Sequence, residues 1–147
     1  MQAIYPYVQL LHVICAIIFL GYIFFDVIIF SRLKGILGDE FDRVKSAISK
    51  KAIKIMPLCL LLLFLTGGMM MSTWVGSKAG GYFQTPLQQI FMIKVILAFV
   101  IGAGVVINLT HRTLGKQPPK FLRENLHNIA FVFGFVIVIL AKVMFMV

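Results

Sequence analysis

Four long apolar stretches constrain this chain more than any other feature of its sequence. They cover residues 5–30, 52–73, 86–110 and 125–146. Each has the roughly 20 residues that an α-helix needs to cross ~30 Å of hydrocarbon. Because only short segments connect them, no separate soluble domain fits in the chain. The sequence therefore predicts one all-α domain over residues 1–147, an integral membrane four-helix bundle.

Lysine and arginine are distributed unevenly over the connecting segments. The first and third connections together hold eleven of them, which are Arg32, Lys34, Arg43, Lys45, Lys50, Lys51, Lys54, Arg112, Lys116, Lys120 and Arg123. The second connection holds only Lys78. Since basic residues gather on the cytoplasmic side, this bias predicts that both termini lie outside, in the periplasm of a bacterial-type inner membrane. The net charge of +9 then reflects contact with anionic lipid in a multi-pass protein, not binding of nucleic acid.

The first connection contains a helical pattern of its own. Phe41, Val44 and Ile48 recur at helical spacing between charged residues. This spacing predicts a short amphipathic helix over residues 39–51 that lies on the inner membrane surface before the second span. A solvated basic connector is the alternative.

Two residues inside the apolar stretches carry chemistry, His12 and Lys94. A charge at the centre of a membrane helix costs at least ~2.5–3.5 kcal/mol, so such residues usually have a partner or a function. At 1.5 Å per residue, His12 lies about 10 Å past Tyr5, and Lys94 lies about 12 Å past the start of the third span. Lys142, close to the C-terminus, belongs to the same outer half. The shared depth predicts a site in the outer leaflet.

The polar residues of each span also share a face. On the first span, one stripe contains His12, Cys15, Phe19, Tyr22 and Asp26. On the second span Thr66, Met70 and Thr73 share a face, and on the third span Lys94 shares one with Asn108. We expect these faces to be turned toward protein, because polar groups in lipid lack partners.

Two ligand sets fit these residues. Imidazole, thiol and thioether groups suit Cu(I), which predicts a copper site made by His12, Cys15, Met70 and Met92. Alternatively, His12 is an axial ligand of haem b, with Lys94 and Lys142 as a second ligand or as partners of the propionates. Methionine also fills irregular gaps in helix bundles, and terminal lysines reach out to the membrane surface, so neither set is unique.

The remaining cysteine and histidine residues allow fewer conclusions. Cys15 and Cys59 fall in opposite leaflets under the predicted topology, too far apart for a disulfide, which needs Cα atoms within ~7 Å. His111 and His127 flank the last basic connection. They fit either a second ligand pair or histidines among lipid headgroups, and the sequence leaves this open.

Short motifs in all four spans resemble a known family. The segments 10–15, 19–21, 65–67, 81–83 and 93–95 are similar to the His-containing first span, the Thr-Gly pair, the tyrosine-glycine loop and the third-span lysine of the copper-resistance protein D (CopD) family. This resemblance implies copper transport or storage.

The positions of His12, Lys94 and Lys142 also resemble the HemJ-type protoporphyrinogen oxidases, which implies haem b. Residues 25–30 depart from that pattern, because they replace its tryptophan and its Tyr-Leu-Pro-Arg-Leu-type segment. A redox enzyme is expected only if haem binds. A structural subunit of a larger membrane complex, or a homo-oligomer, is a third expectation.

Overall fold

The protein is all-α in its computed structural model, which describes residues 3–117 and 119–147 apart from the side chains of Arg123 and Glu124. Four of its helical stretches are long and apolar enough to cross a membrane: Tyr5–Leu37, Glu40–Trp74, Pro86–Thr113 and Asn125–Val143. This agrees with the four expected spans. The chain divides into two compact units, one ending at Gly67 and the other running from Gly68 to Val147.

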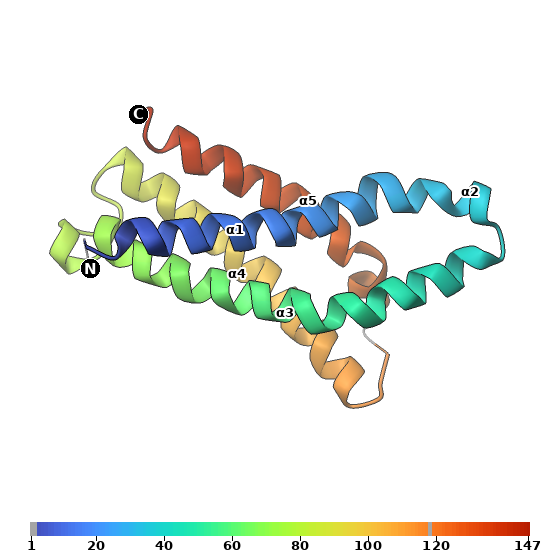
Figure 1. Ribbon diagram of the computed structural model, residues 1–147. Helices are drawn as coiled ribbons and strands as arrows, with labels where there is room; N and C mark the ends of the chain where they lie inside the picture. Colours follow the sequence, from blue (N-terminus) through green and yellow to red (C-terminus); the bar gives the residue numbers. More distant parts are fainter. Residues whose placement is uncertain (1–2, 118) are drawn as a thin grey trace. The chain divides into compact units, whose positions relative to one another are not determined.

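The first unit is a helical hairpin. One arm consists of α1 (Tyr5–Phe24), the π-helix η1 (Phe25–Ile29), the 3-10 helix η2 (Phe30–Leu33) and the short α2 (Lys34–Leu37). The other arm is the part of α3 (Glu40–Trp74) that ends at Gly67, and the two arms run side by side in opposite directions (Figure 1).

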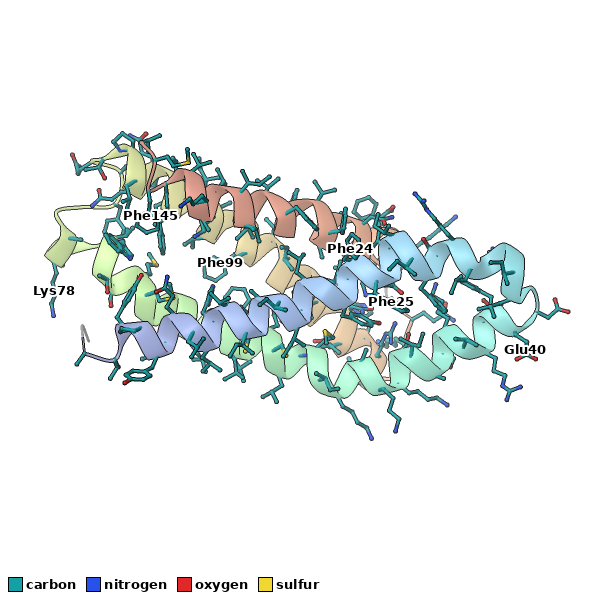
Figure 2. All side chains as sticks on the ribbon, turned by 45° about the horizontal axis from the view of Figure 1, so that its top comes forward. Phe24, Phe25, Glu40, Lys78, Phe99 and Phe145 are labelled. Atoms are coloured by element: carbon teal, nitrogen blue, oxygen red, sulfur yellow. The ribbon has the colours of Figure 1, made fainter. Side chains whose placement is uncertain are left out.

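The turn between the arms depends on Gly38. Its φ of 56° lies in the left-handed region, where a residue without Cβ costs least. Near this turn the rings of Phe30 and Phe41 stack with their centroids 4.9 Å apart. In Figure 2, Glu40 marks the tip of the hairpin. The stacked phenylalanines give the tip a small apolar core of its own.

The expected surface helix over residues 39–51 is not a separate element. Residues 40–51 are instead the first part of α3, which continues to Trp74. No glycine or proline interrupts the chain between residues 40 and 56, so nothing ends the helix where a surface helix would have to turn into a span. The apolar face of these residues packs against the other arm, as the buried ring of Phe41 shows.

The hairpin is longer than a bilayer is thick. Its arms have 33 and 35 residues, which correspond to about 50 Å of helix. The hydrocarbon core measures ~30 Å. The arms are therefore about 20 Å longer than the hydrocarbon core is thick.

The second unit contains the end of α3, the short 3-10 helix η3 (Ser77–Ala79), α4 (Pro86–Thr113) and α5 (Lys120–Val143). The backbones of α4 and α5 approach closely at Gly104, where an added Cβ would lie 2.8 Å from the Leu126 side chain. At the other end of these helices, buried Val75, Phe91 and Met144 form an apolar cluster. Beside it, Trp74 meets Phe145 edge to face at 5.3 Å (Figure 2).

Large apolar side chains point away from the core of each unit. In the four candidate spans, only 11–22% of the most apolar window is buried. Ile17 on α1 is 67% exposed and Phe99 on α4 is 63% exposed. Helices that are apolar on their exposed faces fit a lipid surrounding, so the structure supports contact with the bilayer.

Candidate functional site

The polar stripe of α1 lies against protein, as the sequence predicted. Cys15 is buried, and His12, Tyr22 and Asp26 are partly buried. Their neighbours Leu10 and Ile17 are exposed. The stripe is on the side of α1 that meets α3, because His12 bonds directly to that helix.

The central contact of this interface joins His12 to Thr66. The His12 Nδ1 atom lies 2.7 Å from Thr66 Oγ1, and Thr66 is only 4% exposed. The Thr66 hydroxyl lies 2.6 Å from the carbonyl oxygen of Leu62, one turn earlier on α3. We call this arrangement the His12–Thr66 pair.

The two contacts of Thr66 determine the tautomer of His12. A carbonyl oxygen only accepts, so the single hydroxyl proton of Thr66 is donated to Leu62. The hydroxyl must then accept from His12, whose Nδ1 carries a proton. In the neutral ring the lone pair is therefore on Nε2. Histidines that bind metals are commonly oriented in this way, by a hydrogen bond from the nitrogen that does not bind the metal.

Gly67 lets the imidazole ring of His12 lie close to the backbone of α3, because glycine has no side chain. A Cβ built on Gly67 would lie 3.4 Å from His12 Cε1, closer than most such contacts. A side chain at position 67 would therefore press on the ring. The sequence Thr66-Gly67 thus supplies both a hydrogen-bond acceptor and the space beside it.

Cys15 and Cys59 contradict the expectation that they lie far apart. Both are free thiols, 4% and 6% exposed, and they are close enough for the Cys15 side chain to act on the Cys59 thiol across α1 and α3. Cys15 lies ten residues from the start of α1 at Tyr5, and Cys59 lies fifteen residues from the end of α3 at Trp74. Counted from these helix ends, the two positions differ by only five residues, which is about 7.5 Å of helix.

Lys94 lies in the second unit, in a neutral environment. Its Nζ is 5.1 Å from the centroid of the Phe91 ring and donates to Met144 Sδ at 3.9 Å. Met144 is 2% exposed and Phe91 is 7% exposed. Among the described side chains, no carboxylate pairs with Lys94. A cation–π contact and a thioether stabilise the ammonium only in part.

The other candidate ligands have less specific surroundings. Met92 packs against the cluster formed by Val75, Phe91 and Met144, where it fills core space. Met70 is half-buried, and Lys142 is exposed. In the described part of the chain, no three or more His, Cys, Asp or Glu side chains are grouped in a way that could hold a metal ion.

The histidines at the far end of α4 and α5 have local contacts. His111 Nδ1 lies 2.8 Å from the carbonyl oxygen of Ile107, one turn earlier on α4. His127, on α5, is half-buried. For His111 this contact is with its own helix, so it gives no support to a ligand pair.

Sequence reasoning did not single out Gln88, the most buried polar side chain of the second unit at 3% exposed. Its Oε1 accepts from the Gln84 amide at 3.0 Å. Its Nε2 donates to the carbonyls of Ala79 at 3.0 Å and Trp74 at 3.4 Å. Thr85 caps α4 by accepting from the Gln88 amide, so the order Thr-x-x-Gln, a capping-box pattern, could have identified this residue. Through these hydrogen bonds, Gln88 stabilises the connection between α3 and α4.

We compared the chain with protein-family models, with curated proteins and with solved structures. None of the three comparisons finds a match. Within the described residues, two environments combine buried polar groups with ligand chemistry, the α1–α3 interface and the surroundings of Lys94.

Proposed function

We propose that this multi-pass membrane protein handles Cu(I) at the α1–α3 interface, where Cys15 and Cys59 supply the ligands and His12 is a separate donor on the same interface. The observation that carries this proposal is the presence of two buried, free thiols on the same interface as His12, whose ring is oriented by Thr66. Thiolate and imidazole are ligands that favour Cu(I) among the common metals.

The chemistry of this donor set fits a soft monovalent ion. Binding requires the thiols to lose their protons, so uptake of copper releases protons and weakens as the pH falls. A thiolate pair suffices for Cu(I), which accepts low coordination numbers, and this agrees with the lack of a larger described cluster. His12 stays a separate donor next to the pair, oriented by Thr66.

The charge bias supports an orientation for this function. With the basic connections in the cytoplasm, both termini face the periplasm and His12 lies in the outer half of the inner membrane. Copper would enter from that side and reach the thiols deeper in the interface. The resemblance to the CopD family agrees with such a role in transport or storage.

Binding of haem b is the second candidate function, and Lys94 is the observation that favours it. An ammonium held only by an aromatic ring and a thioether would be stabilised further by an anionic partner, and a porphyrin carboxylate is one. In this alternative Lys94 meets a propionate, as the resemblance to the HemJ-type oxidases implies, and the protein transfers electrons or oxidises a porphyrinogen.

Two measurements on the purified protein distinguish copper binding from haem binding. The protein is prepared in mild detergent, loaded with Cu(I) under reducing conditions without oxygen, and examined by metal analysis and by its visible spectrum. We expect stoichiometric copper that is lost in Cys15→Ser and Cys59→Ser and weakened in His12→Ala. His111→Ala, a histidine change in the other unit, is the matched control and should bind normally.

Other outcomes would contradict the copper proposal. A Soret band that disappears in His12→Ala would establish the haem function in its place. Binding of neither copper nor porphyrin would favour a structural subunit of a membrane complex, for which the exposed apolar faces leave ample contact area.

A further inference from the structure

The register of α1 and α3 brings the only two cysteines of the chain together. The hydrogen bond between His12 and Thr66 fixes one level of the antiparallel pair. From this level, Cys15 lies one turn further along α1, and Cys59 lies two turns back along α3. Both steps go in the same direction in space, and both keep the residue on the face that contains the first contact. The helix geometry alone therefore places the thiols at one interface.

The local surroundings agree with that register. Cys15 and Cys59 are among the most buried side chains of the hairpin, whereas Leu58, the residue before Cys59, is 56% exposed. The Cys15 side chain is close enough to act on the Cys59 thiol. A disulfide requires the two sulfur atoms to approach to ~2.05 Å.

We propose that Cys15 and Cys59 form a reversible dithiol–disulfide pair that links α1 to α3, with a membrane-soluble quinone as the oxidant. Two S–H bonds break and one S–S bond forms. The two electrons and two protons pass to the quinone oxygens, which gives the quinol. A quinone suits this position because thiols buried in an apolar interface are poorly accessible to oxidants dissolved in water.

The disulfide would regulate the site described above. Oxidation consumes both thiolates, so the oxidised protein keeps only His12 as a donor at this interface. This regulatory role rests on the proposed copper function, whereas formation of the disulfide does not depend on it.

The chain is well suited to a direct test because it contains only two cysteines. The purified full-length protein in detergent is incubated with a short-chain ubiquinone analogue, denatured, and treated with a maleimide polymer that adds a fixed mass per free thiol. Reduced protein should take up two labels. After quinone treatment we expect loss of both labels from the monomer, restored by a dithiol reductant.

Control variants test whether the disulfide depends on the positions of Cys15 and Cys59 or reflects general thiol reactivity. Cys15→Ser and Cys59→Ser each leave one thiol, which should stay labelled in the monomer. The double change Cys59→Ser with Leu58→Cys moves the second thiol by one residue to the exposed side of α3, and this protein should keep both labels. Two labels persisting in the quinone-treated native protein, or equal bridging in the Leu58→Cys variant, would overturn the proposal.

A second measurement distinguishes failure of this inference from failure of the copper function. Ag(I), a redox-inert stand-in for Cu(I), is titrated into reduced and oxidised protein. Stoichiometric binding only to the reduced form supports regulation of a metal site by the disulfide. If the disulfide forms but reduced protein does not bind Ag(I), the copper proposal fails and the redox pair stands. Equal binding to both forms would overturn the regulatory role.

Discussion

The hydrogen bond between His12 and Thr66 gives the sharpest prediction for this fold, because it fixes both the helix register and the histidine tautomer. Thr66→Val replaces the hydroxyl with a methyl group of similar size. It removes the acceptor for His12 Nδ1 without creating a cavity. His12→Leu removes the donor. Combining the two changes gives a double-mutant cycle for this single contact.

The expected magnitude follows from the geometry. The contact is short, at 2.7 Å, and Thr66 is nearly fully buried. A neutral hydrogen bond contributes about 0.5–1.5 kcal/mol, and a buried donor left without a partner costs about 1–3 kcal/mol. Each single change should therefore lower the free energy of unfolding by about 1–3 kcal/mol. The double variant should lose less than the sum, with a coupling energy of about 1 kcal/mol.

Unfolding in mixed micelles by titration with sodium dodecyl sulfate, followed by circular dichroism, measures these energies. Thr110→Val is the matched control, because Thr110 also bonds back to its own helix, to Val106 at 2.8 Å, but is exposed. It should change stability by less than about 0.5 kcal/mol. Nitrogen NMR should show the proton on Nδ1 of His12 in the native protein and a mixture of tautomers in Thr66→Val. A coupling energy near zero, or a native ring protonated on Nε2, would refute the reasoning.

Three further predictions concern the second unit, each checked in the same unfolding titration. Gln88→Ala should lower the free energy of unfolding by about 2–4 kcal/mol because the Gln84 amide and two carbonyls lose their partner. Gln89→Ala, at an exposed position, should lower it far less. Equal losses in the two variants would contradict a specific role for Gln88. Gly104→Ala should lower the free energy of unfolding by about 1–2 kcal/mol because its Cβ displaces Leu126. Gly21→Ala on α1, whose added Cβ would have no heavy atom within 4 Å, should leave that free energy unchanged or raise it. Lys94→Met should stabilise the protein by about 1–3 kcal/mol if the ammonium has only neutral neighbours, and a loss of stability would instead indicate a bound anion.

The fold was largely predictable because its main determinant is local in sequence. An apolar stretch of about 20 residues predicts a membrane helix almost regardless of its neighbours, and residues 86–110 needed little else. The start of α4 was equally clear, because Thr85-Pro86 combines a capping residue with proline at the first turn. The continuous α3 was missed because apolar spacing around Phe41 does not reveal which surface covers it: a membrane and the other arm of a hairpin produce the same pattern.

The candidate site was predictable only in part. Helical periodicity correctly assigned His12 and Cys15 to one protected face of α1. Depth counted from the ends of the spans did not pair Cys15 with Cys59, since an uncertainty of a few residues at each end exceeds the separation in question. Contacts such as Lys94 with Met144 join residues 50 positions apart, and no local pattern encodes them.

The irregular backbone of the hairpin has a mechanical consequence. Pro57 lies inside α3 and deprives the Ile53 carbonyl of its usual amide partner, so this arm bends most easily there. The opposite arm has its own soft region, the π-helix over Phe25–Ile29. Both arms thus contain an irregular backbone segment between the tip and the His12–Thr66 pair. We expect the hairpin to bend at these two segments, so that the tip can change direction without altering the contacts of His12 and Thr66.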